Sequence, residues 1–329
     1  MTFTLHTRGS HVRHAADGHR LIGLGSAHAK VILFGEHAVM FGAPAIALPL
    51  PQLETHAELR ATPGEPSRIE SALYAGEAAG APEALRPVTA ALENSLLVAG
   101  LYPRSFDLRI RSSIPHSRGL GSSAAVAAAI ARAAAAAGNV HLKPGLLFSV
   151  VQQSEQIAHG RPSGVDARAV AATGPIRFQD GVGDRMSIGR RFHFVIADSG
   201  LPASTAQAVG LVAARRRQEG ERIESLLFHL GDLAEGAATE LASGDQDALG
   251  ERMSEAHTAL ARIGVSTACI DALATTALGA GALGAKLTGG GLGGCLLVLA
   301  RDPESATRIA RKLRAAGAVR TWQATVSDE

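Results

Sequence analysis

The chain is poor in cysteine and in aromatic residues. Its 329 residues include two cysteines, Cys269 and Cys295, with no CxxC or CxH spacing. This argues against a disulfide framework or a zinc site and favours a reducing compartment. Aromatic residues make up 4% of the chain, so Ala, Leu, Val and Ile must build the core. No apolar run reaches the ~20 residues that span a bilayer, and the N-terminus has no signal-peptide core. We therefore expect a cytoplasmic protein that does not contact a membrane.

The chain also lacks an excess of either charge. Its net charge of +2 is too weak and too scattered to indicate a nucleic-acid partner. Arg215-Arg216-Arg217 is the only tight basic run in the sequence, and such a run is typical of a solvated helix face. A content of 46% hydrophobic and 19% charged residues is that of an ordinary globular protein. Because 329 residues exceed what one core usually fills, we expect two domains.

Hydrophobic periodicity predicts strands and helices in both halves of the chain. Strands are expected over residues 27–34, 45–48, 53–59, 106–110, 192–197, 283–288, 295–300 and 319–326. Helices are expected over residues 87–100, 122–137, 144–159, 203–218, 221–241, 245–263, 267–278 and 303–315. The second half then has the order of an α+β, ferredoxin-like domain.

The predicted domain boundary lies near residues 177–191, which are rich in Gly, Asp and Arg and indicate a hairpin or connector. We expect an N-terminal domain over residues 23–190 and a C-terminal domain over residues 191–329. Residues 1–22 precede them and carry the histidines His6, His11, His14 and His19. A metal site would use such residues, but a flexible extension is the simpler interpretation.

Residues 115–125, Pro-His-Ser-Arg-Gly-Leu-Gly-Ser-Ser-Ala-Ala, are the most informative stretch of the sequence. Gly119 and Gly121 leave the backbone unobstructed, and Ser122 and Ser123 stand where an Ala-rich helix begins. Such a turn binds anions, because the first N–H groups of a helix are free and its dipole is positive at this end. The hydroxyls suit a phosphate or its magnesium ion. No Lys follows the last glycine, so this is not a Walker A loop.

A second informative segment is Lys30-Val-Ile-Leu-Phe-Gly-Glu-His37. Lys30 lies inside an otherwise apolar strand, where a lysine either reaches solvent at an edge or serves a buried anion. Glu36 and His37 follow at a glycine turn. They either converge on a cleft or provide only the polarity of a turn.

Two later segments carry further candidates. Glu155 is predicted in the last turns of a helix, where a carboxylate opposes the helix dipole, and this favours a functional role. Asp166 follows a tight loop and is either an N-cap of a short helix or a functional carboxylate. The glycine-rich residues 286–295 permit close approach to a ligand phosphate or to another backbone. Together, the two glycine loops, the lysine and the two acids suit metal-assisted phosphoryl transfer.

In this combination and order, the sequence resembles the GHMP kinases from about residue 24 to the C-terminus. Lys30–His37 with Ala38-Val39 is similar to the first motif of mevalonate kinases. Galactokinases carry Asp where Val39 stands, and homoserine kinases lack Gly-Glu-His. Residues 115–125 and 286–295 resemble the second and third motifs. The resemblance implies an α+β fold of two domains, the first like domain 2 of ribosomal protein S5 and the second ferredoxin-like, with the active site in the cleft between them.

The resemblance also implies residue roles. Asp166 matches the catalytic base, and Lys30 matches the residue that pairs with it and steadies the substrate hydroxyl. Ser123 and Glu155 match the Mg²⁺ ligands. The expected ATP-binding residues are Pro115, Arg118, Gly119, Leu120, Gly121, Ser122, Ser123 and Ala124. The expected substrate-binding residues are Lys30, Glu36, His37, Asp166, Thr205 and Gly290.

The implied activity is ATP- and Mg²⁺-dependent phosphorylation of the 5-hydroxyl of (R)-mevalonate, in isoprenoid biosynthesis. Members of the superfamily often dimerise, so a homodimer is an expectation. The alternatives are a related kinase acting on phosphomevalonate or another alcohol, and a non-catalytic ATP or ligand sensor with the same fold. Four positions depart from the family pattern. Ser117 stands where Gly is common, and Arg118 stands where a small residue is usual. Met40 replaces the more usual Val, and Ala167 replaces an Asn that often follows the catalytic Asp. Arg118 either alters the loop or itself reaches a phosphate.

Overall fold

The computed structural model describes residues 22–102 and 105–328, and within them the chain has a mixed α/β fold with two sheets. The predicted N-terminal extension with its histidines lies outside the described residues, apart from Ile22. The chain forms two compact units, each made of separate stretches of sequence. Unit 1 takes its described residues from 22–29, 53–114 and 123–162, and unit 2 from 30–52, 115–122 and 163–328. The units are discontinuous because strands β1 and β2 contribute residues to both. The predicted family-domain boundary near residue 190 stays a prediction.

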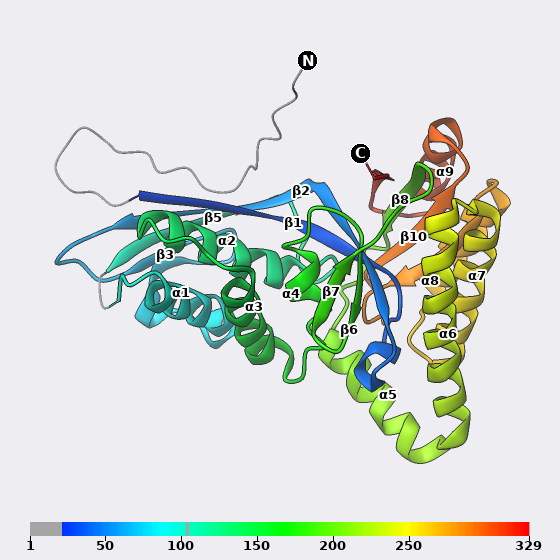
Figure 1. The fold of residues 1–329 in the computed structure, drawn as a ribbon, viewed down its shortest axis with the longest axis horizontal. Helices are drawn as coiled ribbons and strands as arrows, with labels where there is room; N and C mark the ends of the chain where they lie inside the picture. The colour runs from blue at the N-terminus through cyan, green and yellow to red at the C-terminus, as the bar shows by residue number, and fades with distance from the viewer. Residues whose placement is uncertain (1–21, 103–104, 329) are drawn as a thin grey trace. The chain divides into compact units, whose positions relative to one another are not determined.

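Among the described residues, the first sheet has seven strands. Its strand order is β4-β3-β5-β2-β6-β7, and β1 pairs with β2. The strands are β1 (Ile22–Phe34), β2 (Ala45–Ala61), β3 (Arg68–Glu70), β4 (Ala75–Glu77), β5 (Phe106–Ser112), β6 (Ile176–Gln179) and β7 (Val182–Arg185). The α-helices of unit 1 are α1 (Arg86–Val98), α2 (Ser122–Ala137) and α3 (Pro144–His159), and α1 packs against α3 (Figure 1). Two short 3₁₀ helices, η2 (Ala78–Gly80) and η3 (Glu83–Leu85), precede α1.

Strand β2 corrects one expectation from the sequence. Residues 45–48 and 53–59 were expected as separate strands, but a single strand covers Ala45–Ala61. Its first residues pair with β6 over 45–47, and its last residues pair with β5 over 55–61. Pro49 and Pro51 lie between these two ladders, where their missing N–H groups cost no hydrogen bond to either partner. The break in the alternating pattern marks a change of partner within one strand.

Helix α2 packs very closely on strand β1, and the sequence explains why. Its alanines are all buried, and the facing strand carries Gly23 and Gly25. A Cβ at Gly23 would lie 1.9 Å from the carbonyl oxygen of Ala133, and one at Gly25 would lie 2.2 Å from that of Ala129. Helix and strand therefore approach backbone to backbone, which any larger residue at the two glycines would prevent.

The second sheet belongs to unit 2 and has the antiparallel order β11-β8-β10-β9. Its strands are β8 (Phe192–Asp198), β9 (Gly284–Thr288), β10 (Cys295–Ala300) and β11 (Arg320–Val326). The helices of unit 2 are η1 (Ala38–Phe41), α4 (Val165–Ala169), α5 (Thr205–Glu219), α6 (Glu221–Ser243), α7 (Gln246–Ile263), α8 (Ala268–Gly279) and α9 (Pro303–Ala315). Helices α7, α8 and α9 pack against this sheet, and α6 packs against α7 (Figure 1). The α+β expectation is confirmed.

Side-chain caps set the helix ends that periodicity alone placed loosely. Helix α5 begins at Thr205 rather than near residue 203, because the Ser204 hydroxyl accepts a hydrogen bond from the Gln207 N–H. Helix α9 begins with a capping box between Asp302 and Ser305. Hydroxyl and carboxylate side chains thus fix the starts of these helices.

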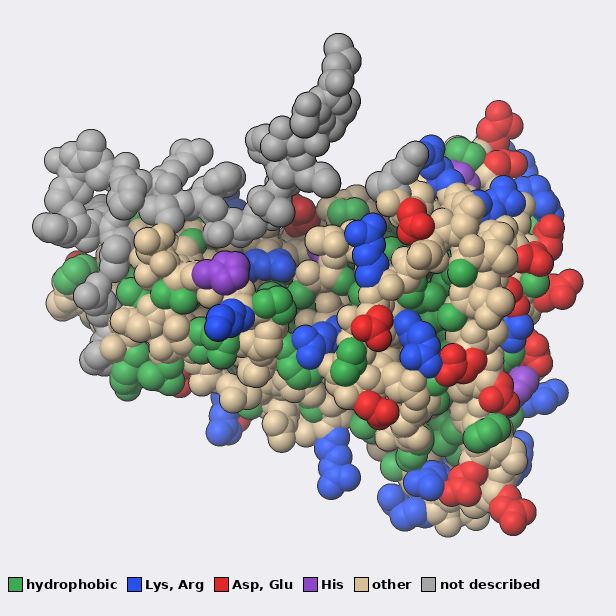
Figure 2. Space-filling view, viewed as in Figure 1, with side chains coloured by type: hydrophobic (Ala, Val, Ile, Leu, Met, Phe, Trp, Pro, Cys, Tyr) green, Lys and Arg blue, Asp and Glu red, His purple; other side chains and the backbone are tan. Residues whose placement is uncertain are grey.

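Many charged side chains of unit 2 form ion pairs. In the basic run of α5, Arg215 lies 2.6 Å from Glu219 and Arg216 lies 2.8 Å from Glu224. On the face shown in Figure 2, basic and acidic side chains are interspersed over the helices of this unit. The run is a helix face, as the sequence predicted.

Across the residues that the structure describes, we find no helix that is both long and apolar enough to cross a membrane.

Candidate active site

Lys30 and Asp166 form an ion pair in unit 2. Lys30 Nζ lies 2.9 Å from Asp166 Oδ1, and the lysine side chain is 2% exposed whereas the aspartate side chain is 28% exposed. Lys30 Nζ also donates a hydrogen bond to the Gly119 carbonyl, at 3.3 Å. Of the two roles open to a lysine in this strand, the structure shows the one that serves an anion. The carboxylate it holds remains accessible from outside the core.

Asp166 is held in place by a short buried helix. It is the second residue of α4, whose N-cap is Gly164 and has no side-chain cap, so an N-cap role for Asp166 is wrong. The neighbouring Val165 and Ala169 are buried in one core cluster with Ile32 of β1, which fixes the helix against the strand that carries Lys30. The carboxylate is therefore free of helix capping and available to the lysine.

The glycine loop at residues 115–122 folds against Lys30. Gly119 and Gly121 have φ values of +74° and +72°, which favour glycine. A Cβ at Gly121 would lie 2.9 Å from Lys30 Cε, and the Lys30 N–H donates to the Leu120 carbonyl at 3.1 Å. Helix α2 begins directly after the loop, at Ser122. The loop therefore leads its chain into a helix N-terminus, the geometry expected of an anion site.

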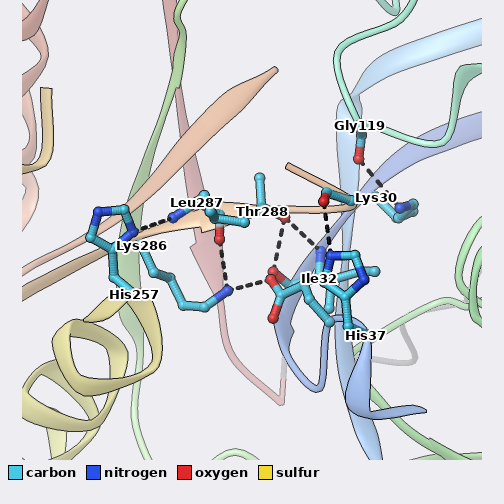
Figure 3. Close-up of polar contacts among 10 residues, drawn as sticks. Lys30, Ile32, His37, Gly119, His257, Lys286, Leu287 and Thr288 are labelled. Atoms are coloured by element: carbon cyan, nitrogen blue, oxygen red, sulfur yellow. Dashed lines mark hydrogen bonds and ion pairs between the residues drawn. The ribbon is translucent and has the colours of Figure 1, made fainter. Parts of the chain in front are cut away.

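Glu36 forms a buried ion pair with Lys286 of β9, and this lysine was missed as a site residue in the sequence. The Glu36 side chain is 1% exposed and that of Lys286 is fully buried. Lys286 Nζ also donates to the Leu287 carbonyl at 2.7 Å (Figure 3). Burial raises the pKa of Glu36 against the opposing effect of Lys286, and burial lowers the pKa of Lys286. The signal that singled out Lys30, a lysine inside an apolar strand, is equally present at Lys286.

His37 connects the first motif to the glycine loop of the third motif (residues 289–294). Its Nε2 lies 2.8 Å from the Gly290 carbonyl. Because a carbonyl only accepts, we assign the ring proton to Nε2. Burial lowers the pKa of His37, which favours this neutral ring. Thr288 adds a second connection, since its hydroxyl donates to the Ile32 carbonyl at 2.9 Å and accepts from the Ile32 N–H at 3.0 Å (Figure 3).

The glycine loop of the third motif approaches other backbone segments closely. A Cβ at Gly289 would lie 3.2 Å from Gly119 Cα, and one at Gly291 would lie 2.2 Å from the Val265 carbonyl oxygen. A Cβ at Gly290 would lie 3.1 Å from Thr205 Cα, at the start of α5. These approaches are to other backbone segments, which is one of the two partners expected for this loop. The structure also brings the predicted substrate residues Thr205 and Gly290 together.

The predicted metal ligands belong to unit 1. Ser123 is in the first turn of α2, and Glu155 is buried in the last turns of α3, as the periodicity predicted. Glu155 lies 3.7 Å from His159 of the same helix. A hydroxyl and a carboxylate are hard oxygen donors, so the donor types fit Mg²⁺, which accepts few protein ligands beside phosphate and water.

The three remaining ATP-loop positions are Pro115, Arg118 and Ala124. Pro115 begins the loop and is half-buried, and Ala124 is buried on the first turn of α2. Arg118 is not directed to open space, because its Nε lies 2.8 Å from Asp198 Oδ1. Sequence reasoning gave no indication of Asp198.

Comparisons with known proteins place the chain in a family. The model of the GHMP kinases N-terminal domain matches residues 85–174, and that of the GHMP kinases C-terminal domain matches residues 237–319. The mevalonate kinase of Thermococcus gammatolerans is 33% identical over 89% of this chain and 93% of its own. That of Pyrococcus horikoshii is 34% identical over 87% and 91%. A crystal structure of L. major mevalonate kinase in complex with R-mevalonate superposes with a TM-score of 0.80 at 28% identity, covering 93% of this chain and 96% of that one.

Proposed function

Because this chain belongs to the GHMP kinase family, among its mevalonate kinases, we propose that it transfers the γ-phosphoryl group of ATP to the 5-hydroxyl of (R)-mevalonate. The observation that carries the proposal is the Lys30–Asp166 ion pair beside the Gly119 carbonyl of the glycine loop. It unites a reachable carboxylate, a buried cation and a phosphate-type loop in unit 2.

Asp166 is the group that accepts the hydroxyl proton. A primary alcohol is a weak nucleophile near neutral pH, and a positioned carboxylate removes its proton as the new P–O bond forms. The bond between the γ-phosphorus and its bridging oxygen then breaks, and ADP leaves. Lys30 holds the carboxylate in place and stabilises the charge that develops on the attacking oxygen.

The glycine loop and the start of α2 bind the triphosphate of ATP. Gly119, Leu120, Gly121 and Ser122 present backbone groups to the phosphates, at a helix end that favours negative charge. Ser123 and Glu155 would hold Mg²⁺. The ion, when bound, neutralises phosphate charge and supplies electrostatic stabilisation of the transferred group.

His37, Thr205 and Gly290 form the proposed mevalonate site. His37 is fixed by Gly290, and Gly290 lies against Thr205. Glu36 supports this site from within the core, because its carboxylate is buried against Lys286. A homodimer and a cytoplasmic location are further proposals, which rest on the resemblance and on the two widely separated cysteines.

An ADP-release assay with four alcohols tests the proposed function. Mevalonate, phosphomevalonate, homoserine and galactose are compared with MgATP in excess, and we expect ADP with mevalonate alone. ADP release with another of these alcohols and not with mevalonate would overturn the substrate assignment. If MgATP raised the melting temperature but no ADP formed with any of the four alcohols, the protein would instead be a ligand sensor.

A further inference from the structure

Arg118 has three protein partners although it lies within the proposed ATP loop. Its Nε is 2.8 Å from Asp198 Oδ1, one terminal nitrogen donates to the Gly200 carbonyl at 3.2 Å, and the other donates to the Ser117 carbonyl at 3.3 Å. The Arg118 side chain is 21% exposed and that of Asp198 is 7% exposed. The guanidinium is thus mostly buried and directed toward the end of β8.

Asp198 is itself fixed by the turn that follows β8. Its Oδ1 accepts a hydrogen bond from the Gly200 N–H at 2.8 Å. The same turn contacts the loop backbone, because the Ala203 N–H donates to the Ser117 carbonyl at 2.8 Å. A Cβ at Gly294 would lie 2.9 Å from the Arg118 carbonyl oxygen, so the glycine loop of the third motif also packs against Arg118. Arg118 therefore contacts a turn that is itself hydrogen-bonded to Asp198 and to the loop.

The residue after Arg118 is Gly119, whose carbonyl accepts the hydrogen bond from Lys30. We propose that Arg118 is a positioning residue: its ion pair with Asp198 fixes the glycine loop, so that Gly119 meets Lys30 and the loop is preformed for nucleotide phosphates. The inference deepens the proposed function and rests on nucleotide binding at this loop. It decides between the two roles that the unusual Arg118 permits, and it assigns a function to Asp198.

A double-mutant cycle separates positioning from direct phosphate contact. The variants are Arg118→Ala, Asp198→Asn and the double variant, and the first measurement is the Kd of a fluorescent ATP analogue with Mg²⁺ and no alcohol. If Arg118 positions the loop through Asp198, each single variant weakens binding by about tenfold, or roughly 1.4 kcal/mol. The double variant is then no weaker than either single variant, because both remove the same interaction.

A direct phosphate contact predicts a different pattern and would overturn the inference. Arg118→Ala would still weaken binding, but Asp198→Asn would leave it unchanged or tighten it, because the guanidinium would be released toward the phosphates. Additive losses in the double variant would also contradict a shared role. Arg118→Lys adds a further test, since an ammonium cannot combine the ion pair with Asp198 and the two hydrogen bonds that the terminal nitrogens of Arg118 donate. If lysine fully restored the affinity for the ATP analogue, charge alone would suffice and the inference would be contradicted.

Steady-state kinetics and a matched control distinguish positioning from general damage. We expect the KM for ATP to rise about tenfold in both single variants, with the KM for mevalonate changed less than twofold. The control is Arg301→Ala, which removes an exposed Arg–Asp pair of the same unit, Arg301 and Asp247 at 2.7 Å. It should leave both constants unchanged. Equal rises in the two KM values would mean that Arg118 only stabilises the fold.

The nucleotide-binding arm also distinguishes failure of this inference from failure of the proposed function. A wild-type protein that binds the ATP analogue but does not phosphorylate mevalonate would refute the substrate assignment, and the cycle would still decide the role of Arg118. A wild-type protein that binds no nucleotide would refute both.

Discussion

Replacing Lys286 with methionine tests whether the buried ion pair stabilises unit 2. Methionine keeps most of the length of the side chain and removes its charge, which leaves the Glu36 carboxylate buried without the partner it contacts. Removing one partner of a buried pair typically costs about 3–5 kcal/mol, because the other charge remains desolvated. The lost hydrogen bond to the Leu287 carbonyl adds to this. We expect the free energy of unfolding to fall by about 4 kcal/mol.

Glu36→Gln should have opposite effects on stability in the wild type and in the Lys286→Met variant. In the wild type this change leaves Lys286 buried and unpaired, so it destabilises the protein. In the Lys286→Met variant it removes an unpaired buried charge, so it stabilises the protein. Replacing both members of a buried pair by neutral groups is often close to neutral overall. The double variant should therefore be more stable than either single variant.

The deficit of Lys286→Met should also depend on pH in a defined direction. Burial already raises the pKa of Glu36 in the folded protein, and removing Lys286 raises that pKa further. A carboxyl whose folded pKa is raised stabilises the protein fully below its unfolded pKa, and this contribution is lost as pH rises through the folded pKa. The difference from wild type should therefore be larger at pH 8 than at pH 5.

The single tryptophan provides the readout. Trp322 lies on β11, in the same four-stranded sheet as Lys286 on β9, so its fluorescence in urea reports unfolding of this sheet. Arg301→Ala is the control and should cost less than ~1 kcal/mol, because its ion pair is exposed. The reasoning fails if Lys286→Met is within ~1 kcal/mol of wild type at pH 8, or if the double variant is the least stable of the three.

Three further predictions concern the proposed catalytic residues. Asp166→Asn should lower kcat by about 10²–10⁴-fold while the ATP analogue still binds; a near-normal kcat would refute the base assignment. Glu155→Gln should raise the Mg²⁺ concentration needed for half-maximal rate, measured by titration at fixed ATP, and an unchanged requirement would remove Glu155 from the metal site. His37→Ala breaks the contact with Gly290, so the KM for mevalonate should rise more than the KM for ATP; the reverse order would contradict the proposed substrate site.

Much of the fold and part of the site could be predicted because their residue types have few alternatives. Glycines with positive φ, such as Gly119 and Gly121, cannot be replaced without strain, so the loop they form is legible in the sequence. The Ala-rich run of α2 likewise requires a closely packed partner. The bounds of a strand could not be predicted where its pairing with other strands decides them. Strand β2 was divided at Pro49 and Pro51, because a local pattern does not show that the strand changes partner there.

The missed residues, Lys286 and Asp198, are those whose importance arises from a distant partner. Lys286 and Glu36 are 250 positions apart, and Arg118 and Asp198 meet only after β8 is placed in its sheet. No local periodicity encodes such a contact. A charged residue inside an apolar strand is the one available signal, and it marks Lys286 as clearly as Lys30. The residue that carries the opposite charge can be identified only from the fold.

The third motif supports the other two by contacting their backbone. Thr288 binds both main-chain groups of Ile32, which holds β1 and therefore Lys30. Gly289 packs on Gly119, whose carbonyl Lys30 also contacts. The glycines of the third motif are thus needed for close packing between segments, independently of any ligand. Substitutions there should disturb the Lys30 environment even where they touch neither ATP nor mevalonate.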